Sequence, residues 1–255
     1  MRDAVAATGR TMAEHDGYQC SRLEYLSTLK HMRSRGRLAH VKYLCLAAAS
    51  GQLEELKLLR EDGCPWNEMT CAYAAWGGHI EVMQWERVNG CPWDERTCSA
   101  VALGGHLEVL KWASAKAFCP WDRDTCAYAA QNGHLEVLQW ARANGCPWNE
   151  DTCGFAAFKG HLDILQWAYS NGCPWDEITC AWAAHGGQLE ILQWARANGC
   201  PWNAETCAKA ALGGHLEVLQ WARANGCPWS ELTCTNAAKG GHLEVLRWAR
   251  ANGCP

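Results

Sequence analysis

The chain has 255 residues, of which 49% are hydrophobic and 20% are charged, and it carries a formal net charge of -4 at pH 7. This balance provides no basic stripe of the kind that neutralises phosphates, so we expect no nucleic-acid partner. No apolar run approaches the ~20 residues of a membrane-spanning helix, and the first ten residues lack the apolar core of a secretory signal. We therefore expect no membrane association and a cytoplasmic location, with the nucleus as the alternative.

Residues 1–42 precede the part of the chain in which a repeat is recognisable. Within them, residues 21–36 have the pattern of a degenerate second helix of the repeat. We expect residues 1–42 to form a helical cap, because the terminal units of an array need a polar outer face. A second hypothesis makes the chain a substrate adaptor that recruits a ubiquitin ligase through residues 1–40. They contain no recruitment motif that supports it.

Residues 43–255 repeat one sequence with a period of 27 residues, marked by a Cys-Pro pair and interrupted by one extra residue in the stretch 113–118. A fixed period of this length predicts a stacked array, in which each unit buries its apolar face against its neighbours. Such an array presents an elongated surface, which favours binding over catalysis. The chain ends at Cys254-Pro255, inside a unit, so we expect a fragment of a longer array. The cysteines of the Cys-Pro pairs are Cys64, Cys91, Cys119, Cys146, Cys173, Cys200, Cys227 and Cys254.

Each unit begins with a short helix that starts after Cys-Pro-Trp. The residue after the Trp is always Asn, Asp or Ser, which can accept hydrogen bonds from the free amides of the first helical turn. The preceding Trp and the Cys at the fourth helical position, such as Trp148 and Cys153, have the spacing of a hydrophobic staple. We therefore expect this Trp to be structural. The predicted N-caps are Asn67, Asp94, Asp122, Asn149, Asp176, Asn203 and Ser230.

A second helix follows a Gly-His or Gly-Gln turn in each unit. In the unit that starts at His134, Leu135, Val137, Leu138, Trp140 and Ala141 form a wide apolar stripe with helical spacing. Asn144-Gly145, followed by Pro147, is a helix stop. Each unit is thus predicted to be a helix, a tight turn and a second helix, with the second-helix Trp in the core. The turn His should hydrogen-bond between adjacent units, a role that Gln can share.

The run Thr-Cys-Ala-Tyr-Ala-Ala-x-x-Gly-His-Leu-Glu-Val-Leu-Gln-Trp at 125–140 resembles the ankyrin repeat, and the resemblance covers residues 43–255. It implies an all-α helical-repeat solenoid of about eight units that binds a partner protein on the concave side formed by the first helices. The unit has 27 residues where ankyrin has 33, and the residues that build ankyrin's projecting β-turn are missing. We therefore expect little or no β-hairpin, and loop-tip contacts of ordinary ankyrins do not carry over.

Three positions of the first helix vary between units, and their spacing of i, i+4 and i+7 places them on one helical face. Stacking the units aligns these positions into a strip that we call the ribbon. The alternative is that an exposed face simply drifts, but drift does not explain the aromatic residues found there, which are enriched in binding hot spots. We expect the ribbon to bind an unidentified partner protein through Tyr73, Trp76, Leu103, Tyr128, Gln131, Phe155, Phe158, Trp182, His185, Lys209, Leu212 and Lys239.

The 17 cysteines and the turn histidines support an alternative, a thiol or metal-binding repeat protein. Two observations oppose it: the two Cys around each first helix are not a close Cys-x-x-Cys pair, and Gln replaces His at Gln52 and Gln188. We expect every thiol to be reduced and to act as a small buried hydrophobe. A catalytic Cys-His pair should be unique, whereas these residues recur in every unit. We therefore expect a monomeric protein-interaction scaffold that is not an enzyme and has no cofactor or metal.

Overall fold

The computed structural model describes residues 41–115 and 120–255, and this part of the chain contains sixteen α-helices and no strand. The helices form eight consecutive pairs, which confirms the predicted all-α solenoid of helix-turn-helix units without a β-hairpin. The predicted cap of residues 1–42 lies outside the described residues, apart from Val41 and Lys42 at the start of α3. The pairs are α3 (Val41–Ala49) with α4 (Leu53–Glu61), α5 (Glu68–Trp76) with α6 (Ile80–Val88), α7 (Glu95–Gly104) with α8 (Leu107–Ala115), α9 (Arg123–Gln131) with α10 (Leu135–Ala143), α11 (Glu150–Lys159) with α12 (Leu162–Ser170), α13 (Glu177–His185) with α14 (Leu189–Ala197), α15 (Ala204–Gly213) with α16 (Leu216–Ala224), and α17 (Glu231–Lys239) with α18 (Leu243–Ala251).

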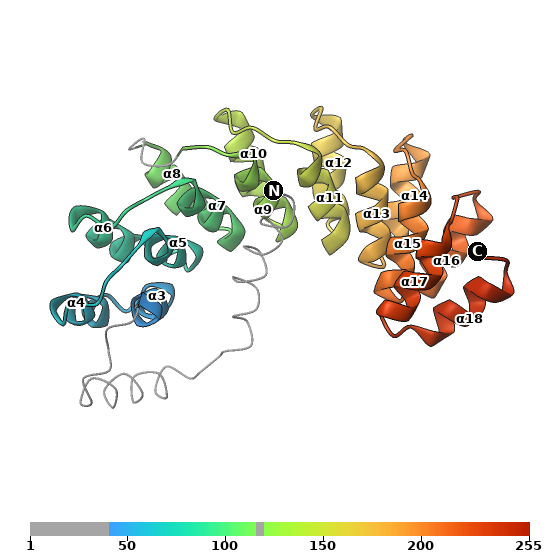
Figure 1. Cartoon of the computed structure of the whole chain (residues 1–255). Coiled ribbons are helices and arrows are strands. Elements are labelled where there is room, and N and C mark those ends of the chain that lie inside the picture. Colours follow the sequence, from blue (N-terminus) through green and yellow to red (C-terminus); the bar gives the residue numbers. More distant parts are fainter. Residues whose placement is uncertain (1–40, 116–119) are drawn as a thin grey trace.

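The units stack into an arch, with the first helix of each pair on the inner side and the second helix on the outer side (Figure 1). First helices pack closely against one another along the whole array, whereas second helices pack mainly on their own first helix. The side chains explain the difference, because first helices carry Cys, Ala and Thr while second helices carry Leu and Trp. Small residues in the inner row and large ones in the outer row produce the curvature. In the described residues, no helix is long and apolar enough to cross a membrane.

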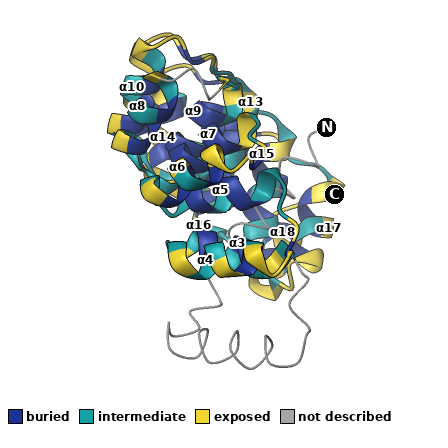
Figure 2. Cartoon of the chain, turned by 90° about the vertical axis from the view of Figure 1, so that its left-hand side faces the viewer, coloured by how far each residue is buried: buried dark blue, intermediate teal, exposed yellow. Residues whose placement is uncertain are grey.

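The core runs between the two rows of helices. In the unit of α9 and α10, Cys126, Ala129 and Ala130 face Val137 and Leu138, and all five are buried. Figure 2 shows that α5, α7 and α9 are mostly buried, while exposed residues gather at the helix ends and loops. The buried cysteines therefore pack as small hydrophobes, as the sequence predicted.

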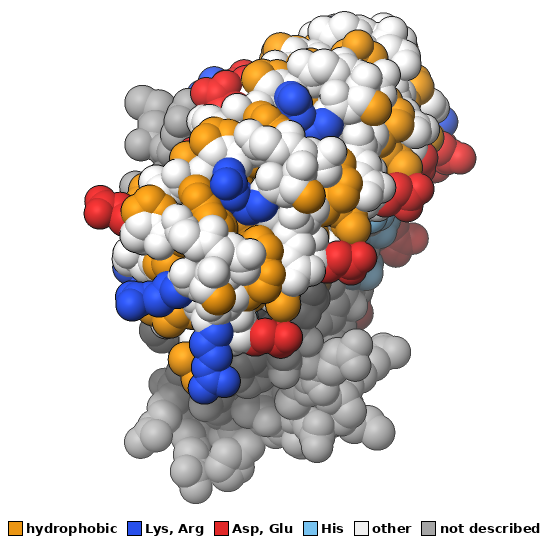
Figure 3. All heavy atoms as spheres, turned by 90° about the vertical axis from the view of Figure 1, so that its right-hand side faces the viewer, with side chains coloured by type: hydrophobic (Ala, Val, Ile, Leu, Met, Phe, Trp, Pro, Cys, Tyr) orange, Lys and Arg blue, Asp and Glu red, His pale blue; other side chains and the backbone are white. Residues whose placement is uncertain are grey.

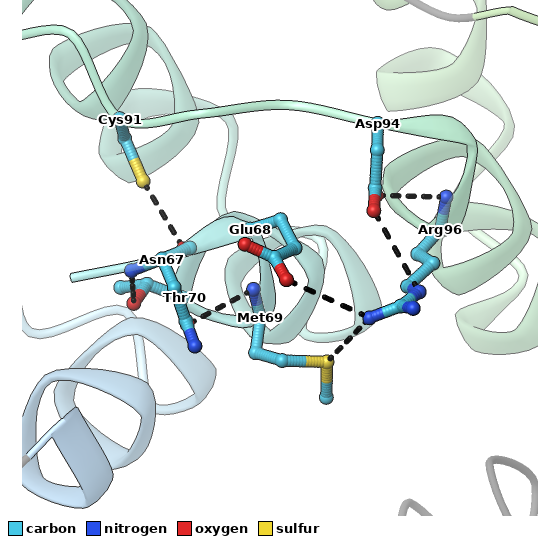
Figure 4. A network of polar contacts seen from close by, with 7 residues as sticks. All are labelled: Asn67, Glu68, Met69, Thr70, Cys91, Asp94 and Arg96. Carbon is cyan, nitrogen blue, oxygen red and sulfur yellow. Dashed lines mark hydrogen bonds and ion pairs between the residues drawn. The ribbon is translucent and has the colours of Figure 1, made fainter.

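The predicted N-caps begin the first helices at the expected residues. Side chains of Asn67, Asp94, Asp122, Asp176 and Asn203 accept a hydrogen bond from a backbone amide of the first turn. Figure 4 shows two of these caps and the link between their units, in which the Arg96 guanidinium lies 3.8 Å from a carboxylate oxygen of Glu68.

Two of the predicted caps occupy the cap position without making the cap hydrogen bond. Asn149 donates its side-chain amide to the carboxylate of Asp151 at 2.8 Å instead, and Ser230 makes no cap bond.

A ladder of histidines joins each unit to the one before it, as the sequence predicted. The ring Nε2–H of each turn His donates to the carbonyl at the C-terminal end of the preceding unit's first helix, at 2.9–3.2 Å. Gln188 takes this role with a 3.5 Å bond from its Nε2 to the Phe158 carbonyl. The position before each turn His requires glycine, and Gly105 shows why. Gly105 has φ 77°, and a Cβ there would lie 2.5 Å from the His134 ring of the next unit.

A second ladder consists of tryptophan pairs, one pair in each of seven units. The Trp of each Cys-Pro-Trp lies against the Trp of its own unit's second helix, with ring centroids 5.8–6.0 Å apart in seven units. This confirms that the Cys-Pro-Trp Trp is structural. The second-helix Trp residues are partly buried and pack against the core, so the prediction that they are core residues holds only in part. Each indole therefore leaves part of its ring exposed to solvent.

The prediction that all thiols are reduced is wrong at Cys98, which is disulfide-bonded. The fourteen other described cysteines are free. In other described units the fold brings the first-helix thiol next to the Cys-Pro thiol that follows the second helix, as with Cys126 and Cys146. The Cys-Pro cysteine that follows Cys98 is Cys119, which lies outside the described residues. Sequence spacing considered only neighbours along the chain and missed this contact.

Candidate functional site

The ribbon residues lie on the first helices, which line the inner side of the arch (Figure 1). Leu103 and Tyr128 are 6% and 8% exposed, so they support the ribbon from below rather than projecting from it. Lys239 is exposed at the end of α17. The others are half-buried, which leaves part of each side chain for a partner: Tyr73, Trp76, Gln131, Phe155, Phe158, Trp182, His185, Lys209 and Leu212.

The fold brings four ribbon residues of α11 and α13 into one cluster, which we call the aromatic patch: Phe155, Phe158, Trp182 and His185. The Phe158 ring lies 5.2 Å from the ring centroids of both Trp182 and His185, and Phe155 lies 6.1 Å from Trp182. Tyr128 of α9 stacks on Phe155 at 6.5 Å and extends the contact to a third unit. Tyr73 and Trp76, on α5, do not join the patch.

Gly154 makes room for the largest residue of the patch. A Cβ on Gly154 would lie 3.1 Å from Cδ1 of Trp182, tighter than an ordinary contact. Other first helices carry Ala, Cys, Ser or Thr at this position, for example Ala127 and Ala181. A Gly inside a helix costs roughly 1 kcal/mol relative to Ala. Gly154 thus leaves space for the Trp182 ring, and α11 is less stable than it would be with Ala at this position.

Two lysines lie beside the aromatic patch. Lys209 places its Nζ 5.2 Å from the centroid of Trp182, and Lys159 places its Nζ 5.5 Å from Phe158. Lys159 is a departure from the repeat framework, as Gly154 is. The position of Lys159 is Gly, Asn or Ser in the other described units, for example Gly186, Asn132 and Ser50.

Sequence reasoning missed Gly154 and Lys159 because it searched only the three variable positions. A comparison of the copies at the framework positions would have found both, since Gly154 is the only Gly and Lys159 the only charged residue among the described copies of its position.

Carboxylates lie at the opposite ends of the first helices, and Asp151 is an example in the first turn of α11. On α11, Asp151 lies in the first turn and Lys159 in the last turn of a helix roughly 15 Å long, so the two side chains are well separated. Burial, followed by repulsion from Asp122, raises the pKa of Asp124 in the ribbon's acidic edge. Burial, followed by repulsion from the Lys209 ammonium, lowers the pKa of His185 and favours its neutral form.

Burial keeps two of the first-helix thiols in their protonated form. Burial raises the pKa of the Cys45 thiol to about 11, and it also raises the pKa of Cys71, so these thiols stay protonated at neutral pH. The turn histidines use Nε2 in the ladder between units. In the part of the chain that the structure describes, no three His, Cys, Asp or Glu side chains are grouped to hold a metal ion.

The surface of the C-terminal half carries mixed charges. On the face shown in Figure 3, single Lys and Arg side chains are surrounded by hydrophobic ones, and acidic side chains lie toward its edges. Several arginines of the second helices lie over Trp rings, as Arg223 does at 4.2 Å from Trp229. This face therefore has no continuous basic stripe.

No family model matches this sequence, and no curated protein matches it. Among solved structures, the chain is similar to the ankyrin repeat domain of human ASB11, with 17% sequence identity and a TM-score of 0.48. The match covers 62% of this chain and 84% of that one. A likeness of this extent is too weak to support an argument about function. The resemblance of this chain to ankyrin repeats therefore remains one of sequence motifs and of helix-turn-helix units.

Proposed function

We propose that the protein is a non-enzymatic scaffold that binds a partner protein along the inner face of the arch. The observation that carries the proposal is the aromatic patch, which joins partly exposed rings of two adjacent units into one surface. Partly exposed aromatic clusters on a rigid surface are typical anchors of protein interfaces. The stack holds the rings in place before a partner arrives, which lowers the entropy lost on binding.

Drift of an exposed face explains the patch less well. Drift predicts mostly polar residues and no change at framework positions, whereas Gly154 departs from the framework beside Trp182. The thiol-binding hypothesis gains no support from the free cysteines of the described residues, because all but Cys254 are buried. The hypothesis of a ubiquitin-ligase adaptor depends on residues 1–40 and stays a prediction.

The test uses substitutions that the chain itself carries in other units. Phe158→Leu reproduces Leu103 and Leu212, and Trp182→Ala reproduces Ala100, so the double variant should fold with unchanged helix content. A control variant, Gln193→Ala with Gln220→Ala, changes the exposed outer side of α14 and α16.

Partners are recovered by proximity labelling with the full chain, and their affinities are measured by calorimetry. The patch variant should lose affinity by about 2 kcal/mol or more, while the control keeps it. Equal affinity of both variants would place the binding surface elsewhere and contradict the proposal.

A further inference from the structure

The inference concerns the chemistry of the partner and rests on the proposed function. The aromatic patch does not offer open ring faces to a cation, because the Lys209 and Lys159 ammonium groups already lie over Trp182 and Phe158. A partner that presented Lys or Arg to the rings would meet two positive charges. The patch therefore selects against basic anchors.

The two lysines are only partly neutralised by the chain itself. Lys209 lies 3.9 Å from Glu205, and the glutamate is half exposed, so the pair is worth little. In the described part of the chain no carboxylate lies within ion-pair distance of Lys159. Burial and the Lys209 ammonium lower the pKa of His185, which disfavours a further positive charge there. The side of the patch that faces the C-terminal end of α11 is thus apolar with a positive border.

Both framework departures meet at this place. Gly154 lets Trp182 lean over α11, and Lys159 replaces the small uncharged residue of other units so that an ammonium borders the same rings. A Lys at the end of a helix also interacts favourably with the helix dipole, but the other first helices end without one at this position. Gly154 adds space for the Trp182 ring, and Lys159 adds a positive charge beside Phe158. Their occurrence at one place indicates a single ligand that contacts both the rings and the ammonium group.

We propose that the aromatic patch binds an acidic segment of a partner protein, in which an apolar side chain lies on Phe158 and Trp182 and flanking Asp or Glu side chains pair with Lys159 and Lys209. The apolar anchor supplies affinity, and the carboxylates select the partner and fix its direction along the arch. The acidic first turns of the same helices repel the segment at the other edge and prevent a shifted position.

A displayed library of random 16-residue peptides, selected on the full chain, tests the partner chemistry and needs no identified partner. Wild-type protein should enrich peptides with Asp or Glu beside an aromatic or branched apolar residue. The lysine variant combines Lys159→Gly and Lys209→Asn, the residues found at Gly186 and Asn236, and should still fold. It should bind the acidic peptides about tenfold more weakly, and their affinity for wild type should fall as salt rises.

The outcomes separate this inference from the proposed function. Peptides that need Trp182 and Phe158 but show no excess of acidic residues would overturn the inference and leave the scaffold function standing. An equal affinity of wild type and the lysine variant for the acidic peptides would overturn it as well. If selection yields no peptide that depends on the patch, the binding surface itself is wrong and both proposals fail.

Discussion

Glu86 of α6 is expected to destabilise its unit, and its replacement by Ala should stabilise the protein. The side chain is fully buried, and neither carboxylate oxygen has a hydrogen-bond partner within bonding geometry. Every other described second helix has an apolar residue at this position, such as Ala141 in α10 and Leu59 in α4. The neighbouring groups that titrate are the thiols of Cys45 and Cys71. They offer weak hydrogen bonding and no positive charge.

Burial raises the pKa of Glu86 from 4.5 to about 8, although contact with the Cys71 thiol opposes this. Below pH 4.5 the carboxyl is protonated in both the folded and unfolded states, and ionisation costs the fold nothing. Between pH 4.5 and about 8 only the unfolded state ionises, so stability falls by roughly 1.4 kcal/mol per pH unit. At pH 7 the loss is on the order of 3 kcal/mol. Above pH 8 both states are ionised and the loss stays constant.

Two variants separate the charge from the shape of Glu86. Glu86→Gln keeps a buried polar group but removes ionisation, so its stability should not decline between about pH 5 and pH 8. Glu86→Ala should be more stable than wild type at pH 7 by about 3 kcal/mol. Because unfolding of a repeat array need not be two-state, hydrogen exchange of α5 and α6 is the primary measurement, with α15 and α16 as the internal reference. Parallel pH profiles for wild type and the Gln variant would refute the reasoning.

Four further predictions test other features of the fold. His134→Gln should leave stability nearly unchanged, because Gln188 makes the same link, whereas His134→Ala should cost about 1 kcal/mol in chemical denaturation. Trp140→Ala should cost about 2–3 kcal/mol, less than the ~3–5 kcal/mol of a fully buried Trp, and a larger loss would contradict its half-buried position. Titration of the denatured, non-reduced chain should find two thiols fewer than after reduction, because of the disulfide at Cys98; equal counts would remove that bond. Gly154→Ala should alter the near-ultraviolet circular dichroism of Trp182, and an unchanged spectrum would mean that the ring does not depend on Gly154.

The sequence was sufficient to predict the elements of this fold because each one depends on local chemistry. A cap residue such as Asp122, a stop such as Asn144-Gly145 and a turn residue such as His134 act within a few residues or on the next identical unit, so the repeat reveals them. Contacts that depend on distance in space were not visible in this way. One example is the contact between the free thiols of Cys126 and Cys146, and another is the partial burial of Trp140. Both depend on how closely the first and second helices pack together.

The candidate site was predictable only in outline for the same reason. Spacing placed Trp182 on the ribbon, but whether a ribbon residue projects or packs depends on its neighbour in the next unit. Tyr128 is buried because Phe155 stacks on it, whereas Trp182 stays half exposed although Phe155 and Phe158 both lie beside it. No property of a single unit distinguishes these two positions.

The positions at which one unit departs from the repeat framework are the most informative ones in such a chain. They differ in whether a loss of stability is accompanied by a change of the surface. Where all other units carry the same kind of residue at a given repeat position, a residue that lowers stability is retained either by chance or because it serves a function. Glu86 is isolated, since it is fully buried in the ordinary framework of its unit and offers no surface to a partner. Gly154 and Lys159 instead act on neighbouring rings of one exposed surface, and the cost of Gly in the helix coincides with room for the Trp182 ring. A destabilising residue that improves a surface is the expected mark of a binding site, because selection for stability alone would restore Ala at position 154.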